Sequence, residues 1–252
     1  MSLCYPDGTQ ALAGVSLHLS AGEFVAIVGQ SGCGKSTLFR IASGLMQPTG
    51  GIALNRAAEA TEYVFQDATL LPWRTLQRNV ELLAELYGLP RAERRRRATE
   101  AIDRVGLTGF AGHKPAALSG GMRMRASLAR ALTLSPRLLL LDEPFGALDE
   151  QTREVLGDRL QELFIADRFA ALLVTHSVSE AVYLANHVLV MSPRPGTVVA
   201  EVAVPFDYPR PPDLRFSPQF AAVAGEVSAA LRGDRERPAG SGHTPPQEVP
   251  AQ

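Results

Sequence analysis

The sequence lacks the features of several specialised classes of protein. Its 252 residues include only two cysteines, Cys4 and Cys33, which excludes a disulfide framework and favours a reducing compartment. The net charge of −1 gives no overall attraction to nucleic acid or anionic lipid. No apolar run approaches the roughly 20 residues that cross a bilayer, and the start, MSLCYPDGTQ, has no apolar signal region. If the protein serves a membrane, it does so through a partner.

What the sequence does contain is a series of short, continuous apolar runs. FVAIVG at 24–29 precedes a helical pattern, and LLLLDEP, ALLVTHS and HVLVMS follow at 138–144, 171–177 and 187–192. Continuous rather than alternating apolar runs are typical of parallel strands that are buried on both faces. The spacing between the runs leaves room for crossover helices. The sequence therefore predicts an α/β fold with a mostly parallel sheet.

The middle and the end of the chain have a different texture. Residues 66–135 contain helical patterns and no convincing strand, so we interpret them as a helical subdomain inserted into a core of residues 1–65 and 136–204. The run RAERRRR there could bind nucleic acid, but it is more typical of a solvated helix face. The C-terminal extension, 205–252, holds half of the 18 prolines. It predicts one amphipathic helix, and then disorder over 234–252, where little apolar surface offsets the ordering entropy.

A phosphate-binding loop is predicted at 29–36, where GQSGCGKS fits the pattern G-x-x-x-x-G-K-[ST] between a strand and a helix. Glycines let successive backbone N–H groups point at a phosphate without interference from a Cβ atom. We expect Lys35 to reach the β- and γ-phosphates of a nucleotide, Ser36 to bind Mg²⁺, and the Thr37 amide to meet the α-phosphate. A glycine-rich turn without a ligand is the alternative. The other phosphate-facing residues are Gly29, Gln30, Ser31, Gly32, Cys33 and Gly34.

Cys33 adds a chemical expectation to this phosphate loop. It lies just before the N-terminus of the predicted helix, a position that favours the thiolate form of a cysteine. We therefore expect alkylation of Cys33 to inhibit turnover, and bound nucleotide to protect the thiol from the reagent.

Two adjacent carboxylates follow the strand in LLLLDEP. Ligands of an open parallel sheet bind beyond the carboxyl ends of its strands. Asp142 is therefore expected to hold Mg²⁺ through water, and Glu143 to polarise the attacking water as a general base. The alternative is a strand-end pair that only caps the following helix.

A second glycine-bearing turn, LSGG at 118–121, opens another helical pattern. Paired glycines allow a close approach of the backbone, and the N-terminus of a helix attracts anions. Ser119, Gly120 and Gly121 are therefore candidates for a second anion site.

With GQSGCGKST, LSGGM, LLLLDEPFGALD and THSVSEA in this order, the chain resembles the ATP-binding subunit of an ABC transporter. The resemblance extends from Tyr5 to about Pro205 and implies a P-loop nucleotide-binding core with a small antiparallel β-subdomain. It implies ATP and Mg²⁺ as cofactors and hydrolysis of ATP to ADP and phosphate as the reaction. It also implies four further site residues, namely Tyr5 stacked on adenine, Gln66 near Mg²⁺ and the attacking water, Asp149 at a dimer contact, and His176 at the γ-phosphate.

Simpler interpretations of three of these residues stay open. Tyr5 could be a packing aromatic, His176 a structural histidine, and Asp149 the cap of a helix, which is compatible with a dimer contact. The chain also departs from the family. It begins without the β-strand that usually precedes the adenine-stacking segment, and GIALNRAAEATEYVF is short, which predicts a trimmed hairpin. Met124 stands where the family commonly carries Gln, and we expect this change to affect only tuning.

By the same resemblance, the LSGG turn lies far from the phosphate loop of its own chain. It would bind the γ-phosphate of ATP held by a second copy, which gives two composite sites in a C₂ dimer. Closure of the dimer would align Glu143, Gln66 and His176 around the attacking water.

The segments VFQDATLLPWRTLQRNV and THSVSEAVYLANHVLVMSPRPGTV resemble importer ATPases of the nitrate, sulfonate and taurine class. This implies a peripheral protein at the cytoplasmic face of the bacterial inner membrane, with an integral membrane permease and a periplasmic or lipoprotein solute-binding protein as partners. Leu71, Pro72 and Trp73 are expected to contact the permease. Trp73 is the only tryptophan, and its large ring suits an interface anchor, although it could instead fill the subdomain core.

Three alternatives to this importer class stay open. The chain could serve an importer of another solute, such as a pyrimidine precursor, bicarbonate or a polyamine. A soluble ABC ATPase that acts on nucleic acid or ribosomes is disfavoured, because tandem ATPase domains, coiled-coil inserts and zinc ligands are lacking; no nucleic-acid partner is expected. A nucleotide kinase would share the phosphate loop, but LSGGM argues against it.

Overall fold

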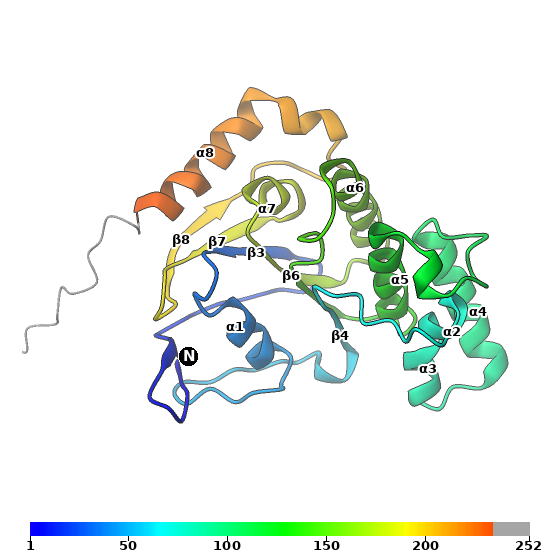
Figure 1. The fold of residues 1–252 in the computed structure, drawn as a ribbon. Coiled ribbons are helices and arrows are strands. Elements are labelled where there is room, and N and C mark those ends of the chain that lie inside the picture. The colour runs from blue at the N-terminus through cyan, green and yellow to red at the C-terminus, as the bar shows by residue number, and fades with distance from the viewer. Residues whose placement is uncertain (234–252) are drawn as a thin grey trace, which may run out of the picture.

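The computed structural model describes residues 1–233. The predicted disorder of residues 234–252 concerns residues outside this part of the chain. The described chain contains a six-stranded sheet, a two-stranded sheet and a group of helices at one side (Figure 1). This arrangement confirms the predicted α/β class with a mostly parallel sheet and a small antiparallel one.

The large sheet contains the four strands that the apolar runs predict. Its strand order is β4-β5-β6-β3-β7-β8, and all neighbours are parallel except β7 and β8. The small sheet pairs β1 with β2 in antiparallel orientation. The bounds are β1 (Leu3–Cys4), β2 (Gln10–Leu12), β3 (Phe24–Gly29), β4 (Thr61–Val64), β5 (Leu138–Asp142), β6 (Ala170–Thr175), β7 (His187–Met191) and β8 (Val198–Ala203).

The central strand β3 is fully buried because both of its faces are covered. Its alternate residues point to opposite faces of the sheet. Phe24, Ala26 and Val28 belong to one apolar cluster, and Val25 and Ile27 belong to the other. Figure 1 shows α1 on one side of the sheet and α6 and α7 on the other side. These two cores explain why the strand is apolar at every position.

The helices fall into those that cover the sheet and those that form the separate group. The covering helices are α1 (Lys35–Ala42), α5 (Gly120–Leu132), α6 (Glu150–Asp167), α7 (Val178–Leu184) and α8 (Pro218–Gly233). The separate group is α2 (Leu76–Val80), α3 (Leu82–Leu86) and α4 (Arg91–Arg104), which pack with α5. Short 3₁₀ turns occur at η1 (Ala58–Ala60), η2 (Pro115–Ala117) and η3 (Pro212–Phe216). The predicted amphipathic helix of the C-terminal extension is present as α8.

The segment 66–135 contains helices and no strand, as its sequence pattern predicts. The arginine run lies on α4, where Glu93 pairs with Arg96 and Arg97, each at 2.7 Å. Arg96 also pairs with Glu100 at 2.7 Å. Exposed pairs of this kind contribute little to stability. The run therefore forms the solvated helix face that the sequence favours.

The short segment before β4 differs from its prediction. A trimmed hairpin is expected there, but residues 51–60 form a loop and the turn η1, with no strand. The apolar side chains of Ile52 and Leu54 in this loop are exposed, so they do not form the buried face of a paired strand. The predicted hairpin is therefore absent from residues 51–60.

The segment after β8 is fastened to the core by one buried arginine. Arg210 is only 2% exposed, and its Nη1 donates to the carbonyl oxygens of Val182, Tyr183 and Ala185 at 2.9–3.0 Å. These are free carbonyls at the end of α7. The backbone of Arg210 also bonds to the Gln161 side chain of α6. The chain beyond β8 therefore supplies hydrogen-bond partners to the end of α7 and to a buried side chain of α6.

Candidate nucleotide-binding site

The phosphate loop joins the end of β3 to the start of α1 (Figure 1). Gly34 has a φ of 106°, and a Cβ atom there would lie 2.8 Å from the Ala11 carbonyl oxygen, so only glycine fits. The Lys35 ammonium donates to the carbonyl oxygens of Gly29 and Gln30 at 2.9 and 3.0 Å. Its side chain is 6% exposed. The lysine is therefore held inside the loop that it follows.

Three of the predicted site residues meet where β3, β5 and β6 end. The Glu143 Oε1 atom lies 3.9 Å from Lys35 Nζ, and Glu143 Oε2 lies 3.2 Å from His176 Nδ1. Glu143 has a left-handed backbone with a φ of 45°, a conformation that clusters at functional sites. The structure thus places a cation, a carboxylate and an imidazole in contact at the carboxyl edge of the sheet, where ligands bind in such folds.

Gln66 approaches the same carboxylate from the loop after β4. The evidence is the position of Gly146, where a Cβ atom would lie 3.7 Å from both Gln66 Nε2 and Glu143 Oε2. Gln66 is exposed, so its amide is accessible beside the carboxylate. The structure therefore brings Gln66 into the group of Lys35, Glu143 and His176.

Asp142 has a partner that the sequence interpretation missed. Its Oδ2 accepts a hydrogen bond of 2.8 Å from the Tyr63 hydroxyl of β4. Burial raises the pKa of Asp142, although the hydrogen bond from Tyr63 opposes this shift. Burial, and then the same hydrogen bond, raise the pKa of Tyr63. The parallel pairing of Tyr63 with Leu140 in the neighbouring strand brings the phenol to this edge. The only available signal was the position of Tyr63 at the end of a short strand.

Few residues could bind Mg²⁺ directly, which agrees with the coordination that this ion prefers. Within residues 1–233, no group of three His, Cys, Asp or Glu side chains could hold a metal by itself. Mg²⁺ usually binds one or two protein oxygens, with phosphates and water completing its shell. Ser36, at the exposed start of α1, and Asp142 and Gln66 supply such oxygens at one edge of the sheet. The donors fit the expected ion.

Tyr5 lies beside the first turn of α1. Its hydroxyl forms a hydrogen bond of 3.0 Å with Thr37 Oγ1, and its ring packs against the apolar cluster on this side of the sheet. The ring is only partly buried. The structure therefore places Tyr5 at the border of the phosphate loop, and its stacking on adenine stays a prediction.

The expectation that the position of Cys33 favours its thiolate form is wrong, whereas inhibition by alkylation and protection by nucleotide stay predictions. Its side chain is 1% exposed, and a Cβ atom added to Gly29 would lie 2.8 Å from its Sγ. Burial raises the pKa of the thiol, and the nearby Lys35 charge opposes this shift without cancelling it. The thiol lies in the apolar cluster on this side of the sheet, so desolvation decides its ionisation.

The LSGG turn starts α5 at a different place. Ser119 caps the helix by accepting a hydrogen bond of 3.2 Å from the Met122 N–H. Gly121 is buried against α6, and a Cβ atom there would lie 2.4 Å from Thr152 Cγ2. Within residues 1–233, no hydrogen bond or ion pair joins Ser119, Gly120 or Gly121 to the phosphate loop. The structure therefore leaves the LSGG turn outside the group around Glu143.

Two residues near the LSGG turn have clear packing roles. Asp149 caps α6, because it accepts hydrogen bonds from the Thr152 N–H at 3.0 Å and the Thr152 hydroxyl at 2.7 Å. This confirms the capping interpretation, and the dimer contact stays a prediction. Met124 is buried in the apolar cluster of α5 and its neighbours. A glutamine at that position would need a buried polar partner.

Leu71, Pro72 and Trp73 lie in a loop that is held in place by hydrogen bonds to the Asn79 side chain. The buried Asn79 side chain accepts from the Leu71 N–H at 2.7 Å and donates to the Leu71 carbonyl oxygen at 3.1 Å. Trp73 is 69% exposed. The alternative that its ring fills the subdomain core is therefore wrong, because the ring projects from a rigid loop.

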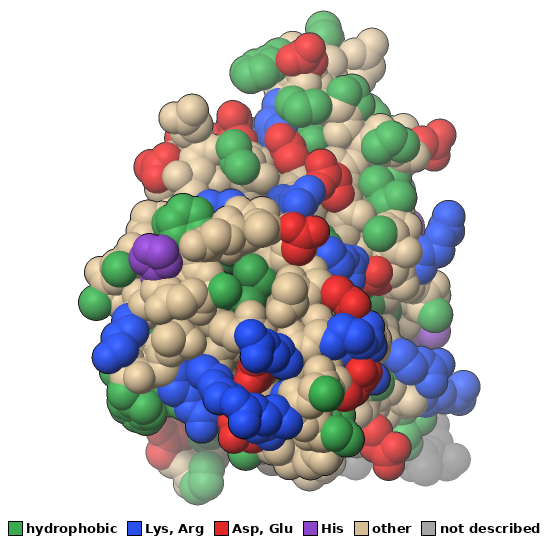
Figure 2. All heavy atoms as spheres, turned by 90° about the vertical axis from the view of Figure 1, so that its right-hand side faces the viewer, with side chains coloured by type: hydrophobic (Ala, Val, Ile, Leu, Met, Phe, Trp, Pro, Cys, Tyr) green, Lys and Arg blue, Asp and Glu red, His purple; other side chains and the backbone are tan. Residues whose placement is uncertain are grey.

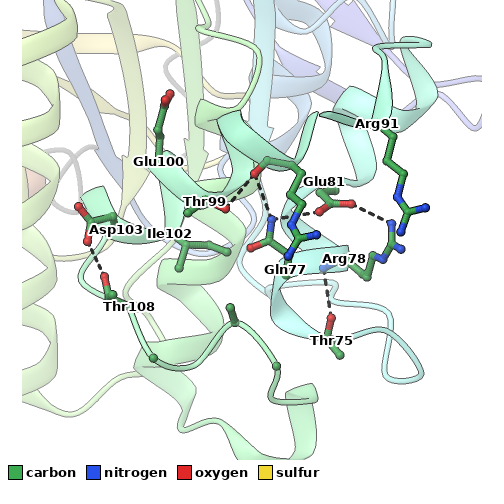
Figure 3. Close-up of a pocket in the computed structure, with 14 residues that line it drawn as sticks. Thr75, Gln77, Arg78, Glu81, Arg91, Thr99, Glu100, Ile102, Asp103 and Thr108 are labelled. Atoms are coloured by element: carbon green, nitrogen blue, oxygen red, sulfur yellow. Dashed lines mark hydrogen bonds and ion pairs between the residues drawn. The ribbon is translucent and has the colours of Figure 1, made fainter. Parts of the chain in front are cut away.

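A pocket of about 660 Å³ begins at Thr75, two residues after Trp73. Residues of α2 and α4 face each other across it (Figure 3). Its charged lining includes Arg78, Glu81, Arg91, Arg95, Glu100 and Asp103. Figure 2 shows this side of the molecule, where Lys and Arg side chains gather with acidic side chains among them. The helical group thus has a hollow with several charged side chains in its wall, close in sequence to the exposed ring of Trp73.

Comparisons with known proteins agree with this site. The family model described as ABC transporter matches residues 12–146. The aliphatic sulfonates import ATP-binding protein of Pseudomonas entomophila is 50% identical over 86% of this chain and 79% of its own length. The taurine import ATP-binding protein of Yersinia pestis is 41% identical over 91% of this chain and 88% of its own length.

Solved structures show the same similarity. A bacterial ABC transporter cassette solved as a dimer is 33% identical, with a TM-score of 0.71 over 82% of this chain and 97% of that chain.

Among residues 1–233, no helix is long and apolar enough to cross a membrane.

Proposed function

Because the chain belongs to the family of ABC transporter ATP-binding subunits, we propose that it hydrolyses ATP to drive import of an organic sulfonate through a separate membrane permease. The names of its relatives support this solute class, since they are import proteins for aliphatic sulfonates and for taurine. Taurine and alkanesulfonates share a sulfonate group on a short carbon chain. The solute itself would be bound by the permease and a periplasmic or lipoprotein solute-binding protein.

The contact of Glu143 with both Lys35 and His176 is the observation that carries the catalytic proposal. Lys35 would neutralise the β- and γ-phosphates from within the loop. Glu143 would accept the proton of the attacking water, and His176, 3.2 Å away, would orient the carboxylate and contact the γ-phosphate. Gln66, whose amide lies near Glu143 Oε2, would help to position the water.

Other residues of the site would bind and orient the nucleotide. Ser36 and Asp142 would hold Mg²⁺, which when bound neutralises charge that develops on the phosphate oxygens. Tyr5 would stack on the adenine, because its ring borders the phosphate loop and stays partly open. The backbone of residues 29–37 would donate hydrogen bonds to the phosphates.

A second copy of the chain would complete the site. The LSGG turn has free N–H groups at the start of α5 and no charged partner among residues 1–233, so its helix terminus is available to an anion. In a C₂ dimer each turn would face the ATP held by the other copy, next to Asp149. Dimers are known for a similar cassette. Loss of the γ-phosphate would then open the dimer.

The permease would dock on the exposed loop of Leu71, Pro72 and Trp73. The loop is held rigid by Asn79, and the adjoining pocket has charged walls that could receive a polar segment (Figure 3). An aromatic anchor beside such a hollow is typical of an interface. This contact would place the protein at the cytoplasmic face of the cell membrane.

Substitution of Glu143 by glutamine tests the catalytic proposal. The Glu143→Gln variant keeps the shape of the site but cannot accept a proton, so we expect phosphate release to fall by at least about 100-fold. ATP binding should persist, and size exclusion in ATP should show a stable dimer. Glu150→Gln, which changes an exposed carboxylate on α6, is the matched control and should behave as wild type. Preserved hydrolysis, or a monomer in ATP, would contradict the proposal.

A separate experiment tests the solute. Vesicles that contain this chain with its permease, and that are supplied with the solute-binding protein outside and ATP inside, should take up labelled taurine or an alkanesulfonate. Uptake of bicarbonate or a pyrimidine precursor in its place would reject the sulfonate class and leave the ATPase proposal intact.

A further inference from the structure

A buried arginine joins α5 to the loop that follows Gln66. Arg130 is 7% exposed and lies near the C-terminal end of α5. Its Nη1 donates to the Thr69 carbonyl oxygen at 3.0 Å, and its Nη2 donates to the Ala68 carbonyl oxygen at 3.1 Å. Nη2 also donates to the Thr69 hydroxyl at 3.0 Å. One guanidinium therefore grips two successive residues of the loop.

The loop depends on this contact for its shape. Thr69 has a φ of 45°, a left-handed conformation that is unusual for a β-branched residue and persists only where surroundings impose it. Within the described chain, the hydrogen bonds that leave residues 66–70 are those to Arg130. Gln66 and Asp67 are exposed. The arginine is thus the polar contact that holds the loop in place.

Arg130 is near enough to the Glu62 carboxylate for the two charges to interact, but the two side chains form no ion pair. Within residues 1–233, no acidic side chain forms an ion pair with Arg130. A buried charge requires hydrogen bonds to be tolerated, and carbonyl dipoles supply them here. Removal of Arg130 would leave the Ala68 and Thr69 carbonyl oxygens without these donors. The hydrogen bonds to the loop therefore account for the burial of the Arg130 charge.

The same helix begins at the LSGG turn. Arg130 follows Gly120 by ten residues, which is about 15 Å along a rigid helix. Gln66 belongs to the site around Glu143 of its own chain, whereas the LSGG turn lacks contact with that site. We propose that Arg130 is a positioning residue, which holds Gln66 beside Glu143 and links its position to that of the LSGG turn. This inference rests on the proposed function.

The consequence is that the two composite sites of a dimer would be mechanically linked. A shift of α5, caused by ATP of the partner at the LSGG turn, would move Ala68 and Thr69 and hence Gln66 in the other site. Arginine suits this task better than lysine, because its planar fork spans two acceptors at once, whereas an ammonium is a point donor on a flexible stem.

Steady-state hydrolysis by the full chain tests the proposal. Arg130→Met should lower kcat by on the order of 10-fold to 100-fold, since small misplacements of catalytic groups cost that much. The KM for ATP should change little, because the phosphate loop and Tyr5 are untouched. Arg130→Lys should recover only part of kcat. A lysine variant with wild-type kcat would overturn the proposal, and this variant decides the matter if Arg130→Met does not fold.

The chain offers a matched control on the same helix. Arg125 Nη1 also donates to two carbonyl oxygens, those of Val105 at 3.4 Å and Gly106 at 3.2 Å, but these lie at the end of α4 and away from Gln66. Arg125→Met should lower the unfolding midpoint to a similar degree as Arg130→Met while kcat stays near wild type. An equal loss of kcat in both variants would show that Arg130 only supports the fold.

A double-mutant cycle with Gln66→Ala separates positioning from stability. If Arg130 acts through Gln66, Arg130→Met should cause no further loss of kcat in a Gln66→Ala background. Equal losses in both backgrounds would overturn the proposal. A Glu143→Gln variant that still hydrolyses ATP would instead reject the proposed function, so the two failures are distinguishable.

Discussion

Helices α1 and α5 begin with similar local structure, but different residues surround their N-termini. Each starts after a turn rich in glycine, with free backbone N–H groups at its first residues. At the start of α1, the same chain brings Lys35, Glu143 and His176 into contact. At the start of α5, the neighbours are Leu148 and Thr152, which only pack. The same local structure is thus a nearly complete site in one place and half of a site in the other.

The position of each turn relative to the sheet explains why the first site is nearly complete and the second is not. The turn before α1 follows a central strand, and the loops after β5 and β6 emerge at the same edge, so side chains from three segments converge there. The turn before α5 follows the helical group and the short turn η2, so it is not the continuation of a strand. Convergence of loops, rather than the helix terminus itself, makes the first site chemically competent.

The largest effect should come from separating the two half-sites into different chains. Lys35→Ala disables the phosphate loop, and Ser119→Arg blocks the LSGG turn, so each pure variant should lose at least about 100-fold of its ATPase rate. In an equal mixture, half of the dimers are mixed, and each pairs one intact phosphate loop with one intact LSGG turn. Independent sites would return about a quarter of the wild-type rate. The proposed linkage through Arg130 would lower this value, because the chain with the intact loop carries the blocked turn. Phosphate release measures both. A mixture as inactive as its components would show that the turn of one copy does not by itself activate the loop of the other.

A smaller effect should follow from filling the tight contact beside the LSGG turn. Gly121→Ala would place a Cβ atom 2.4 Å from Thr152 Cγ2 and should lower the free energy of unfolding by about 1–3 kcal/mol. Thr152→Ser removes that methyl group and keeps the hydroxyl that bonds to Asp149, so it should restore stability in the double variant.

Gly120→Ala is the control for this contact, because its Cβ atom would lie 3.6 Å from Leu148 Cδ2, an ordinary distance. It should leave stability unchanged or raise it slightly, since alanine favours helix. Urea unfolding measures all four proteins. Equal losses for Gly120→Ala and Gly121→Ala would mean that steric contact with α6 is not the cause.

The neighbouring charges of Glu62 on β4 and Arg130 on α5 should affect the pH dependence of stability. Burial raises the pKa of Glu62 to about 7, and the nearby Arg130 opposes the shift. The folded state therefore binds this proton more tightly than the unfolded state, so the free energy of unfolding should fall as the pH rises from about 5 to about 8. Glu62→Gln should remove this contribution. Urea unfolding at both pH values measures it, and an unchanged pH dependence in the variant would contradict the buried carboxyl.

The smallest effect concerns the two thiols. Cys4 is exposed, whereas Cys33 is buried and its pKa is raised by burial, so iodoacetamide should modify Cys4 first. Peptide mass spectrometry over time gives both rates, with Cys4→Ser as the control that isolates Cys33. Equal rates would show that the phosphate loop opens enough to expose its core-facing thiol.

The parts of the fold that sequence predicts well are those whose pattern is local. Strands β3, β5, β6 and β7 are apolar at nearly every position, because both faces of the sheet are covered. Strand β8 escapes such a search, because it lies at the edge of the sheet and its buried and exposed residues are interspersed. The spacing of the phosphate loop likewise predicts Lys35, because the lysine and its glycines are neighbours in sequence.

The parts that sequence does not predict depend on distant partners. The ionisation of Cys33 is decided by its burial in a core that includes Met191, which a helix-terminus argument omits. Arg130 looks like an ordinary helix former in MRMRASLARAL, and its role appears only when Ala68 and Thr69, about sixty residues earlier, are seen beside it. The boundaries of the nucleotide-binding core and the helical subdomain stay a prediction.

The clamp formed by Arg210 limits how the chain can be shortened or joined to other proteins. A version that stopped at about residue 204 would keep the eight strands described for residues 1–233. It would, however, leave the carbonyl oxygens at the end of α7 without the donors of Arg210, and the Gln161 amide without its contacts to the Arg210 backbone. Each such buried orphan costs about 1–3 kcal/mol. The minimal expressible unit therefore extends through Arg210, and reporters or affinity tags belong after Gly233, where they leave the clamp intact.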